Sequence, residues 1–378
     1  MVRTSARTPS TKRKRGATRP LIACVFGTRP QLIKVASVWQ LLSQQSRLLL
    51  IDSGQHYDHA MAGTFYAGKR IRTPDINLGI KAKSAGSQVA RIAAALDPVF
   101  TRRRPDAIVT FGDTSTTVGA AIAAAYQNIP VAHVEAGLRS FDLRAAEEKN
   151  RVLTDHLSRW LFCPTQTAIA NLKNEGITRG VFGVGDVLCE TFREVQSRAT
   201  PNDLFTSFGL TDGDYYLVTC HRAETTDNPE RLRELVTVLE DLDRPTLFAV
   251  HPRARKNLIR QRLWQRLKRV KTLHLVAPFD HESTIAAIAG AKAVLTDSGG
   301  VQREAYWSRV PCLVLRDRTE WVELTNCGAV RVVGLNLTRV RNALRTRWSI
   351  RTTRDTHFRK HNASQKIVQI LLRELTSR

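Results

Sequence analysis

The sequence lacks the features of several classes of protein. No stretch approaches the roughly 18 uninterrupted apolar residues of a membrane span, so we expect no membrane crossing. No apolar signal-peptide segment follows the N-terminus. The six cysteines are scattered and form no CxxC pair, which argues against both a disulfide framework and a zinc site. We therefore expect a reduced, cytoplasmic location.

Common cofactor motifs are also missing. No GxGxxG follows an expected strand, and no HExxH or comparable metal-ligand spacing occurs. "GTFYAGKR" (63–70) approaches a phosphate-binding P-loop, but Arg70 stands where Ser or Thr is required and no strand precedes it. We interpret that match as chance, and we predict neither a metal nor a bound dinucleotide.

Acidic residues are few beside the basic ones, 34 against 58, which gives a formal net charge of +24. Residues 1–20 contain only basic charges and predict a disordered arm. Nucleic-acid contact, nuclear import and targeting stay open for this arm. A solubilising tail is the simpler interpretation, so nucleic acid is not the expected partner. The basic charge in the rest of the chain would suit a nucleotide ligand.

What the sequence does contain is a repeated alternation of short β-branched runs with helical patterns. Six such runs precede a polar stretch at 195–214, and six more follow it. Apolar strands that alternate with helices predict parallel sheets covered on both faces. We predict an α/β protein with two doubly wound domains, 21–195 and 196–362, and a C-terminal helix at 363–378 that packs back on the first domain.

In such domains ligands bind beyond the carboxyl ends of the strands. Polar side chains occupy those ends in both halves of the sequence: Thr28, Arg29, Asp113, Glu135, His221, His251 and Ser298. We therefore predict a ligand site between the two domains.

The second half carries a nucleotide-diphosphate signal in "LTDSGGVQREAYW" (295–307). Ser298 can cap a helix there, and Gly299 and Gly300 let backbone amides approach a phosphate. Glu304 could reach ribose hydroxyls. A plain strand–helix turn is the alternative. From the first half, Arg29 suits a phosphate contact or a structural ion pair.

The first half supplies carboxylates: Asp113, Glu135 and Glu147. Eight charged residues fall between Glu135 and Arg151. Glu135 and Arg139 are expected to face the interdomain cleft, and Glu147 and Arg151 share a helix face four residues apart. Four others are expected in solvent: Asp142, Arg144, Glu148 and Lys149.

Taken together, these motifs resemble the non-hydrolysing UDP-N-acetylglucosamine 2-epimerase family. The resemblance runs from about Ile22 to Gly334 through co-linear blocks. The blocks include "FGTRPQLIK", "GQHYD", "GDTSTT", "HVEAGLRS", "EEKNRVLTDH", "HRAETTDNPERL", "LTDSGGVQREA" and "LRDRTEWVE".

The resemblance implies a glycosyltransferase-B fold, in which two Rossmann-like domains hold the substrate between them. It also implies a homodimer that needs neither NAD nor metal. The reaction would be elimination of UDP, which leaves 2-acetamidoglucal, followed by readdition with protonation on the opposite face.

The same resemblance assigns roles by matched motif. The implied catalytic residues are Asp113, Glu135, Glu147 and His221. The implied substrate-binding residues are Arg29, Lys34, Arg139, Arg151, His251, Phe279, Ser298, Gly299, Gly300 and Glu304. Gln55 and His56 would contribute to an activator site for a second UDP-sugar.

Four alternatives stay open at this point. "TEWVE" leans toward members that act on a diacetamido-uronate derivative of UDP-N-acetylglucosamine. A glycosyltransferase of the same fold would need the UDP half of the site but not the carboxylates, and a hydrolysing epimerase would release UDP. A polyanion-binding protein on a decayed fold is supported only by the basic charge.

Overall fold

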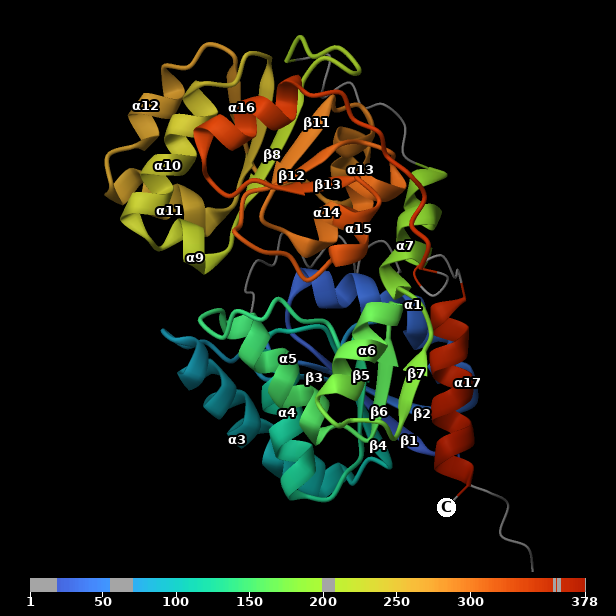
Figure 1. The fold of residues 1–378 in the computed structure, drawn as a ribbon. Helices are drawn as coiled ribbons and strands as arrows, with labels where there is room; N and C mark the ends of the chain where they lie inside the picture. The colour runs from blue at the N-terminus through green and yellow to red at the C-terminus, as the bar shows by residue number, and fades with distance from the viewer. Residues whose placement is uncertain (1–18, 55–70, 199–207, 356–357, 359–361, 378) are drawn as a thin grey trace, which may run out of the picture.

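A computed structural model describes residues 19–54, 71–198, 208–355, 358 and 362–377 of the chain (Figure 1). The greater part of the basic arm, the P-loop-like stretch, and the predicted activator residues Gln55 and His56 lie outside the described residues.

The N-terminal lobe is built on a parallel sheet with the strand order β3-β2-β1-β4-β5-β6-β7. Its strands are β1 (Leu21–Phe26), β2 (Arg47–Asp52), β3 (Ile76–Asn77), β4 (Ala107–Phe111), β5 (Val131–Val134), β6 (Trp160–Cys163) and β7 (Val181–Gly183). Its helices are α1 (Arg29–Gln45), α3 (Ala85–Arg103), α4 (Ser115–Tyr126), α5 (Ala146–Leu157), α6 (Gln166–Asn174) and α7 (Val187–Gln196). The sequence pattern missed β3, because two residues are too few to show a period.

The C-terminal lobe has a second parallel sheet, with the order β10-β9-β8-β11-β12-β13. Its strands are β8 (Tyr216–Cys220), β9 (Thr246–Val250), β10 (Leu273–Val276), β11 (Ala293–Thr296), β12 (Cys312–Val314) and β13 (Val330–Val332). Its helices are α9 (Ala223–Thr226), α10 (Pro229–Glu240), α11 (Pro252–Arg260), α12 (Trp264–Lys268), α13 (His281–Ala289), α14 (Gly299–Trp307), α15 (Val322–Asn326) and α16 (Leu337–Arg345).

Each central strand supplies side chains to two apolar cores. Along β1, Ile22, Cys24 and Phe26 pack into one core, whereas Ala23 and Val25 pack into the other. Successive side chains of a strand point to opposite faces of the sheet, so a strand covered on both faces must be apolar throughout. This requirement explains the continuous apolar runs of the sequence.

The last helix, α17 (Ala363–Thr376), returns to the N-terminal lobe and lies along α1 (Figure 1). Its buried face, Ile367, Val368 and Leu371, joins the core that also contains Leu32 and Val35 of α1. The last described helix therefore packs on the first one.

The prediction of two doubly wound α/β domains is confirmed by the two parallel sheets. The N-terminal order places β1 beside β4, which creates the switch point at which doubly wound folds bind ligands. The two lobes face each other in the glycosyltransferase-B manner, with α7 alongside both (Figure 1). None of the helices in the described ranges is long and apolar enough to cross a membrane.

Candidate active site

The two lobes meet through charged side chains at the carboxyl ends of their strands. Four cross-lobe ion pairs within the described residues join Arg151 to Glu320, Arg222 to Glu147, and Arg303 to both Glu135 and Asp186. A cavity of about 220 Å³ lies at the same interface, and both lobes line it: Asp142, Arg144, Ala145, Glu224, Arg231, Arg316, Asp317 and Arg318. The predicted interdomain site therefore corresponds to a real junction between the lobes.

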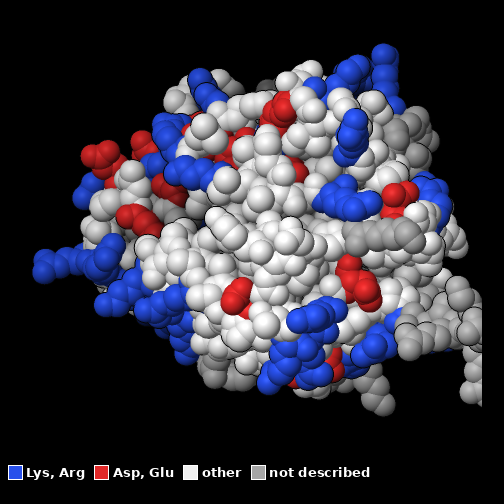
Figure 2. Space-filling view, turned by 90° about the horizontal axis from the view of Figure 1, so that it is seen from below, with Lys and Arg blue, Asp and Glu red and all other residues white. Residues whose placement is uncertain are grey.

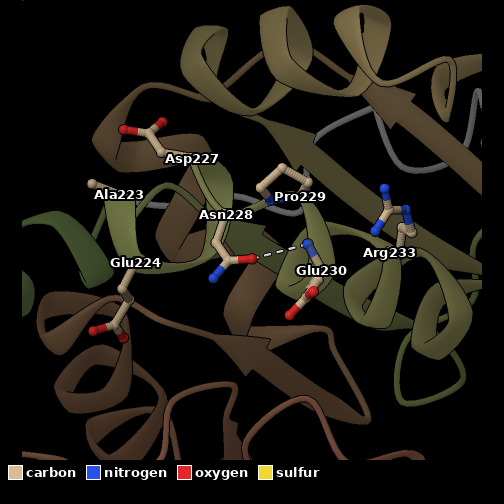
Figure 3. A pocket seen from close by; sticks show the side chains of 7 residues that line it. All are labelled: Ala223, Glu224, Asp227, Asn228, Pro229, Glu230 and Arg233. Carbon is tan, nitrogen blue, oxygen red and sulfur yellow. Dashed lines mark hydrogen bonds between the residues drawn. The ribbon is translucent and has the colours of Figure 1, made fainter.

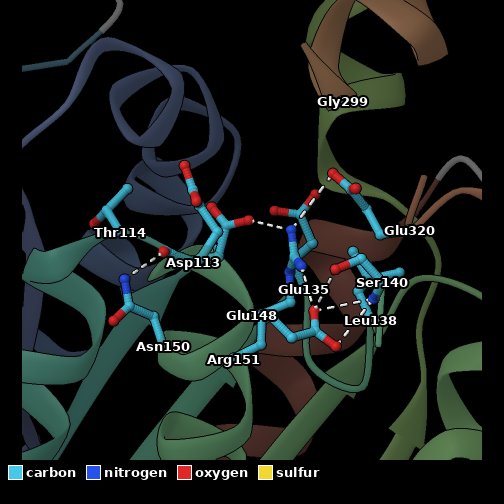
Figure 4. A network of polar contacts seen from close by, with 12 residues as sticks. Asp113, Thr114, Glu135, Leu138, Ser140, Glu148, Asn150, Arg151, Gly299 and Glu320 are labelled. Atoms are coloured by element: carbon cyan, nitrogen blue, oxygen red, sulfur yellow. Dashed lines mark hydrogen bonds and ion pairs between the residues drawn. The ribbon is translucent and has the colours of Figure 1, made fainter. Parts of the chain in front are cut away.

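Asp113 follows β4 and points toward this junction (Figure 4). Its carboxylate pairs with Arg151, and its carbonyl oxygen accepts a bond from Nδ2 of Asn150 at 2.9 Å. Burial raises the pKa of Asp113, but Arg151 and Arg222 outweigh burial and hold the pKa below its usual value. Asp113 is therefore ionised and fixed by the helix α5, which carries both of its partners.

Glu135 follows β5 in a backbone conformation that side chains rarely adopt, with φ of 76°. The carboxylate lies between two cations, Lys34 of α1 and Arg303 of α14, and the distance from Arg303 Nη1 to Glu135 Oε1 is 2.7 Å. Burial raises the pKa of Glu135, whereas the two cations lower it by a larger amount. Strain of this kind is typical of functional sites, where the surrounding structure holds it in place.

Gly112 makes the pair between Lys34 and Glu135 possible. A Cβ atom at this position would lie 2.8 Å from Lys34 Nζ and 3.1 Å from Glu135 Oε2. Its φ of 66° also favours glycine. The turn after β4 thus leaves room for the ion pair between Lys34 of α1 and Glu135, which follows the neighbouring strand β5.

Glu147 begins the charged face of α5 and pairs with Arg222 of the other lobe, with 2.8 Å from Oε1 to Nη1. Its side chain is 34% exposed, more than that of Asp113 or Glu135. Each of the three predicted acid/base carboxylates thus pairs with one arginine, and two of these arginines come from the opposite lobe.

The C-terminal lobe supplies a histidine whose ring is oriented by an aspartate. Asp297, fully buried after β11, accepts from the backbone amides of His221 and Arg222 and lies 3.1 Å from His221 Nδ1. Burial raises the pKa of Asp297, but His221 and these amides hold it far below its usual value. A carboxylate on Nδ1 leaves the Nε2 atom of His221 available to a ligand.

The glycine turn before α14 has the predicted cap. Ser298 Oγ accepts from the amide of Val301 at 3.5 Å. A Cβ atom on Gly299 would lie 2.7 Å from Glu320 Oε1, whereas one on Gly300 would meet nothing closer than 3.7 Å. The turn therefore presents the positive end of α14 at the lobe junction, as a phosphate site requires.

The other predicted binding residues lie around this turn. Arg29 donates to the carbonyl oxygen of Phe279 at 2.6 Å, which joins the two lobes. The rings of His251 and His221 have centroids 5.8 Å apart. Glu304 is buried on α14 and bonds with His281 at 2.9 Å.

Two expectations for the charged stretch 135–151 are wrong. Glu148 is not in solvent but 1% exposed, because it accepts from Arg151 and from the backbone amides of Ser140 and Phe141. Arg139 does not face the cleft: it binds Asp155 and Glu175 within the N-terminal lobe. Glu148 finds backbone partners in the loop between β5 and α5, whereas Arg139 leaves that loop to reach α5 and the end of α6, and the helical period describes neither contact.

The sequence motifs did not single out Glu320, or the arginines Arg222, Arg303 and Arg316, as candidates for the site. Glu320 is buried and binds Arg316 at 2.8 Å, with Arg151 and Arg222 at 3.4 and 3.5 Å (Figure 4). The motif "TEWVE" contains Glu320, and "HRAE" contains Arg222. Nothing in either motif says that these side chains meet across the junction.

Two other surfaces of the molecule differ from this junction. A shallow hollow beside α9 and the start of α10 gathers Glu224, Asp227, Glu230 and Arg233 and, like the junction cavity, is lined by none of the predicted site residues (Figure 3). Seen from below, Lys and Arg lie mostly toward the edges of the face, around a broad area without charged side chains (Figure 2). Within the described ranges, no three His, Cys, Asp or Glu side chains are grouped as metal ligands would be.

Comparison with known proteins points to one family. The family model described as UDP-N-acetylglucosamine 2-epimerase matches residues 41–372. A Methanococcus maripaludis protein named UDP-N-acetylglucosamine 2-epimerase homolog is 39% identical over 352 residues, which cover 93% of this chain and 99% of that protein. The UDP-2,3-diacetamido-2,3-dideoxy-D-glucuronate 2-epimerase of Pseudomonas aeruginosa is 38% identical over 322 residues, 83% of this chain and 88% of that protein.

Solved structures agree. The crystal structure of Methanocaldococcus jannaschii UDP-GlcNAc 2-epimerase in complex with UDP-GlcNAc and UDP matches with a TM-score of 0.85 and 35% identity, and covers 93% of this chain and 99% of that one. The chain belongs to the UDP-N-acetylglucosamine 2-epimerase family.

Proposed function

We propose that this chain, an epimerase by its family, interconverts UDP-N-acetylglucosamine and UDP-N-acetylmannosamine. The observation that supports this most is the placement of Asp113, Glu135 and Glu147 opposite His221 and the capped glycine turn. One lobe offers groups that exchange protons, and the other offers donors for a diphosphate. Inversion at an unactivated carbon without a redox step needs both.

The proposed chemistry proceeds by elimination. A carboxylate removes the proton from carbon 2, the bond between carbon 1 and the UDP oxygen breaks, and 2-acetamidoglucal and UDP remain bound. UDP then adds back to carbon 1, and carbon 2 takes a proton on the opposite face. Two acid/base groups suit this sequence better than one, because the proton leaves one face and arrives at the other.

His221 and the turn of Ser298, Gly299 and Gly300 in the C-terminal lobe would stabilise the departing diphosphate, together with Arg29 of the N-terminal lobe. Preorganised donors of this type contribute about 3–4 kcal/mol each to the transition state. Glu304 would hold the ribose, and Lys34 and Arg151 would keep Glu135 and Asp113 ionised.

A single experiment tests the proposal. The purified chain is incubated with UDP-N-acetylglucosamine in deuterium oxide, and carbon 2 is followed by NMR. We expect deuterium at carbon 2, formation of UDP-N-acetylmannosamine and no net release of UDP. Net release would indicate a hydrolysing enzyme, and transfer to an added sugar acceptor without exchange would indicate a glycosyltransferase.

An alternative substrate rests on one observation, the 38% identity to the diacetamido-glucuronate epimerase of P. aeruginosa. The same NMR assay with that UDP-uronate decides between the two. Exchange on the uronate alone would replace UDP-N-acetylglucosamine as the substrate, and no exchange on either would overturn the proposed function.

A homodimer is part of the proposal. Leu153 and Leu157, one turn apart on α5, are 51% and 37% exposed, and adjacent exposed leucines on a helix suit a protein contact. Light scattering should give twice the chain mass for the wild-type protein and a single chain mass for Leu153→Glu. A wild-type monomer would contradict the proposed homodimer.

The free thiols of the six buried cysteines suit a reducing compartment, which supports a cytoplasmic location.

A further inference from the structure

Arg303 is a buried arginine whose role the reaction above does not use. It lies on α14, five residues after Ser298, and is 3% exposed. Its Nη1 atom lies 2.6 Å from Asp186 Oδ2 and 2.7 Å from Glu135 Oε1, and Nε donates to the carbonyl oxygen of Gly299 at 3.1 Å. The guanidinium carbon lies 4.0 Å from the centroid of the Trp321 ring. A guanidinium held on all sides in this way has little freedom to move.

The contact crosses from one lobe to the other. Arg303 and Trp321 belong to the C-terminal lobe, whereas Glu135 and Asp186 belong to the N-terminal lobe. Asp113 differs in this respect, because its bonded partner Arg151 lies on α5 of the same lobe. Glu135 therefore receives one cation, Lys34, from its own lobe and the second only where the lobes touch.

The charged groups that act on Glu135 within the described residues come from both lobes. Lys34 of α1 and Arg303 of α14 favour its ionised form, and Asp113 after β4 opposes it. Asp186, at the start of α7, shares Arg303 with Glu135 and is itself disfavoured as an anion by burial and by Glu135. Without Arg303, Glu135 would keep Lys34 as its cation, and Asp186 would lose the cation that lowers its pKa.

We infer that Arg303 is a positioning residue for Glu135, which gains its second cation only when the lobes are together, so that lobe contact sets both its orientation and its charge. The inference rests on the proposed role of Glu135 in proton transfer. Substrate is held between the lobes in this fold, so the coupling would prepare the carboxylate at the moment when the site closes.

The test compares three variants by kcat, KM and the pH dependence of kcat/KM. Arg303→Met removes the cation, and we expect kcat to fall about 100-fold, the effect of losing an acid/base group. The acid limb of its curve of kcat/KM against pH should move up by about 1 pH unit. An opposite charge at this distance lowers a carboxyl pKa by that much or more, and the variant removes that charge. KM should change by less than kcat. Arg303→Lys should recover part of the kcat and should show a smaller upward shift of the acid limb.

Asp186→Asn is the matched control. It breaks the other ion pair of the same guanidinium but leaves the contact with Glu135, and it removes a like charge near that carboxylate. We expect its acid limb to stay or to move to lower pH, the opposite direction to Arg303→Met.

Two results would overturn the inference: an acid limb of Arg303→Met at the wild-type pH, or equal kcat losses in Arg303→Met and Asp186→Asn without a shift. If the Met variant does not fold, Arg303→Gln removes the same charge, keeps a donor and must show the same upward shift. Failure of the proposed function is distinguishable, because the wild-type chain itself would then show no exchange at carbon 2. Normal exchange in Glu135→Gln would remove the premise separately.

Discussion

Arg151 and Glu320 lie on opposite lobes, with 3.4 Å between Nη2 of the arginine and Oε1 of the glutamate. Both side chains are almost completely buried, so this contact differs from the surface ion pairs of the molecule. Arg316 and Arg222 approach the same glutamate, which makes Glu320 the shared anion of three arginines. These cations outweigh the effect of burial and hold the pKa of Glu320 well below its usual value.

Neutralising Glu320 should therefore destabilise the folded chain. Removing one partner of a buried ion pair leaves an uncompensated charge and costs about 3–5 kcal/mol. We expect Glu320→Gln to lower the free energy of unfolding in urea by that amount. Asp142→Asn is the control, since its pair with Arg144 is exposed and should contribute at most about 1 kcal/mol. Equal losses in the two variants would contradict the shared-anion role.

The acid/base carboxylates can be separated from binding. Asp113→Asn and Glu135→Gln keep the size of the side chain but remove its proton affinity, so each should lower turnover by at least about 100-fold. UDP should still bind, because both substitutions leave its proposed donors, Arg29, His221 and the turn at Ser298, unchanged. Exchange at carbon 2 by NMR and UDP binding by calorimetry measure the two effects. A variant with near-normal exchange would remove that residue from the catalytic set.

Gly112 offers a steric test of the pair between Lys34 and Glu135. In Gly112→Ala, the new Cβ atom would lie 2.8 Å from Lys34 Nζ, so the lysine must move and turnover should fall. Gly176→Ala is matched in backbone strain, with φ of 80° against 66°, but its Cβ atom would meet nothing within 4 Å. Both should lose about 1 kcal/mol of stability. Only Gly112→Ala should lose activity as well.

Stability should depend on pH through Asp155. Burial raises the pKa of this carboxyl, but His133 and Arg139 lower it by a larger amount. The folded-state pKa therefore lies below the ordinary value. The unfolded chain therefore takes up the proton first, at about pH 4. The stabilisation is complete above that pH and is lost as the pH falls through the folded-state pKa. Asp155→Asn should flatten the acid side of a curve of unfolding free energy against pH; an unchanged slope would show that other carboxyls dominate.

Much of the fold could be read from the sequence, because strand and helix patterns are local. The six runs of the second half correspond to β8–β13, and Ser298 caps α14 as its position before two glycines predicted. The placement of Asp113 and Glu135 after strands β4 and β5 also followed, since parallel strands bring their carboxyl ends to one edge of a sheet.

The sequence by itself determined which residues stand at the strand ends and to which family the blocks belong, because both depend on short-range order. Only the tertiary structure decided which charge meets which. Glu148 turns into a loop rather than into solvent, Arg139 binds within its own lobe, and Arg303 and Glu320 complete the site from the other lobe. The cross-lobe ion pairs of Arg303 and Glu320 join residues far apart in the chain. Their geometry is set by how the two sheets, which are built from separate parts of the chain, come to face each other.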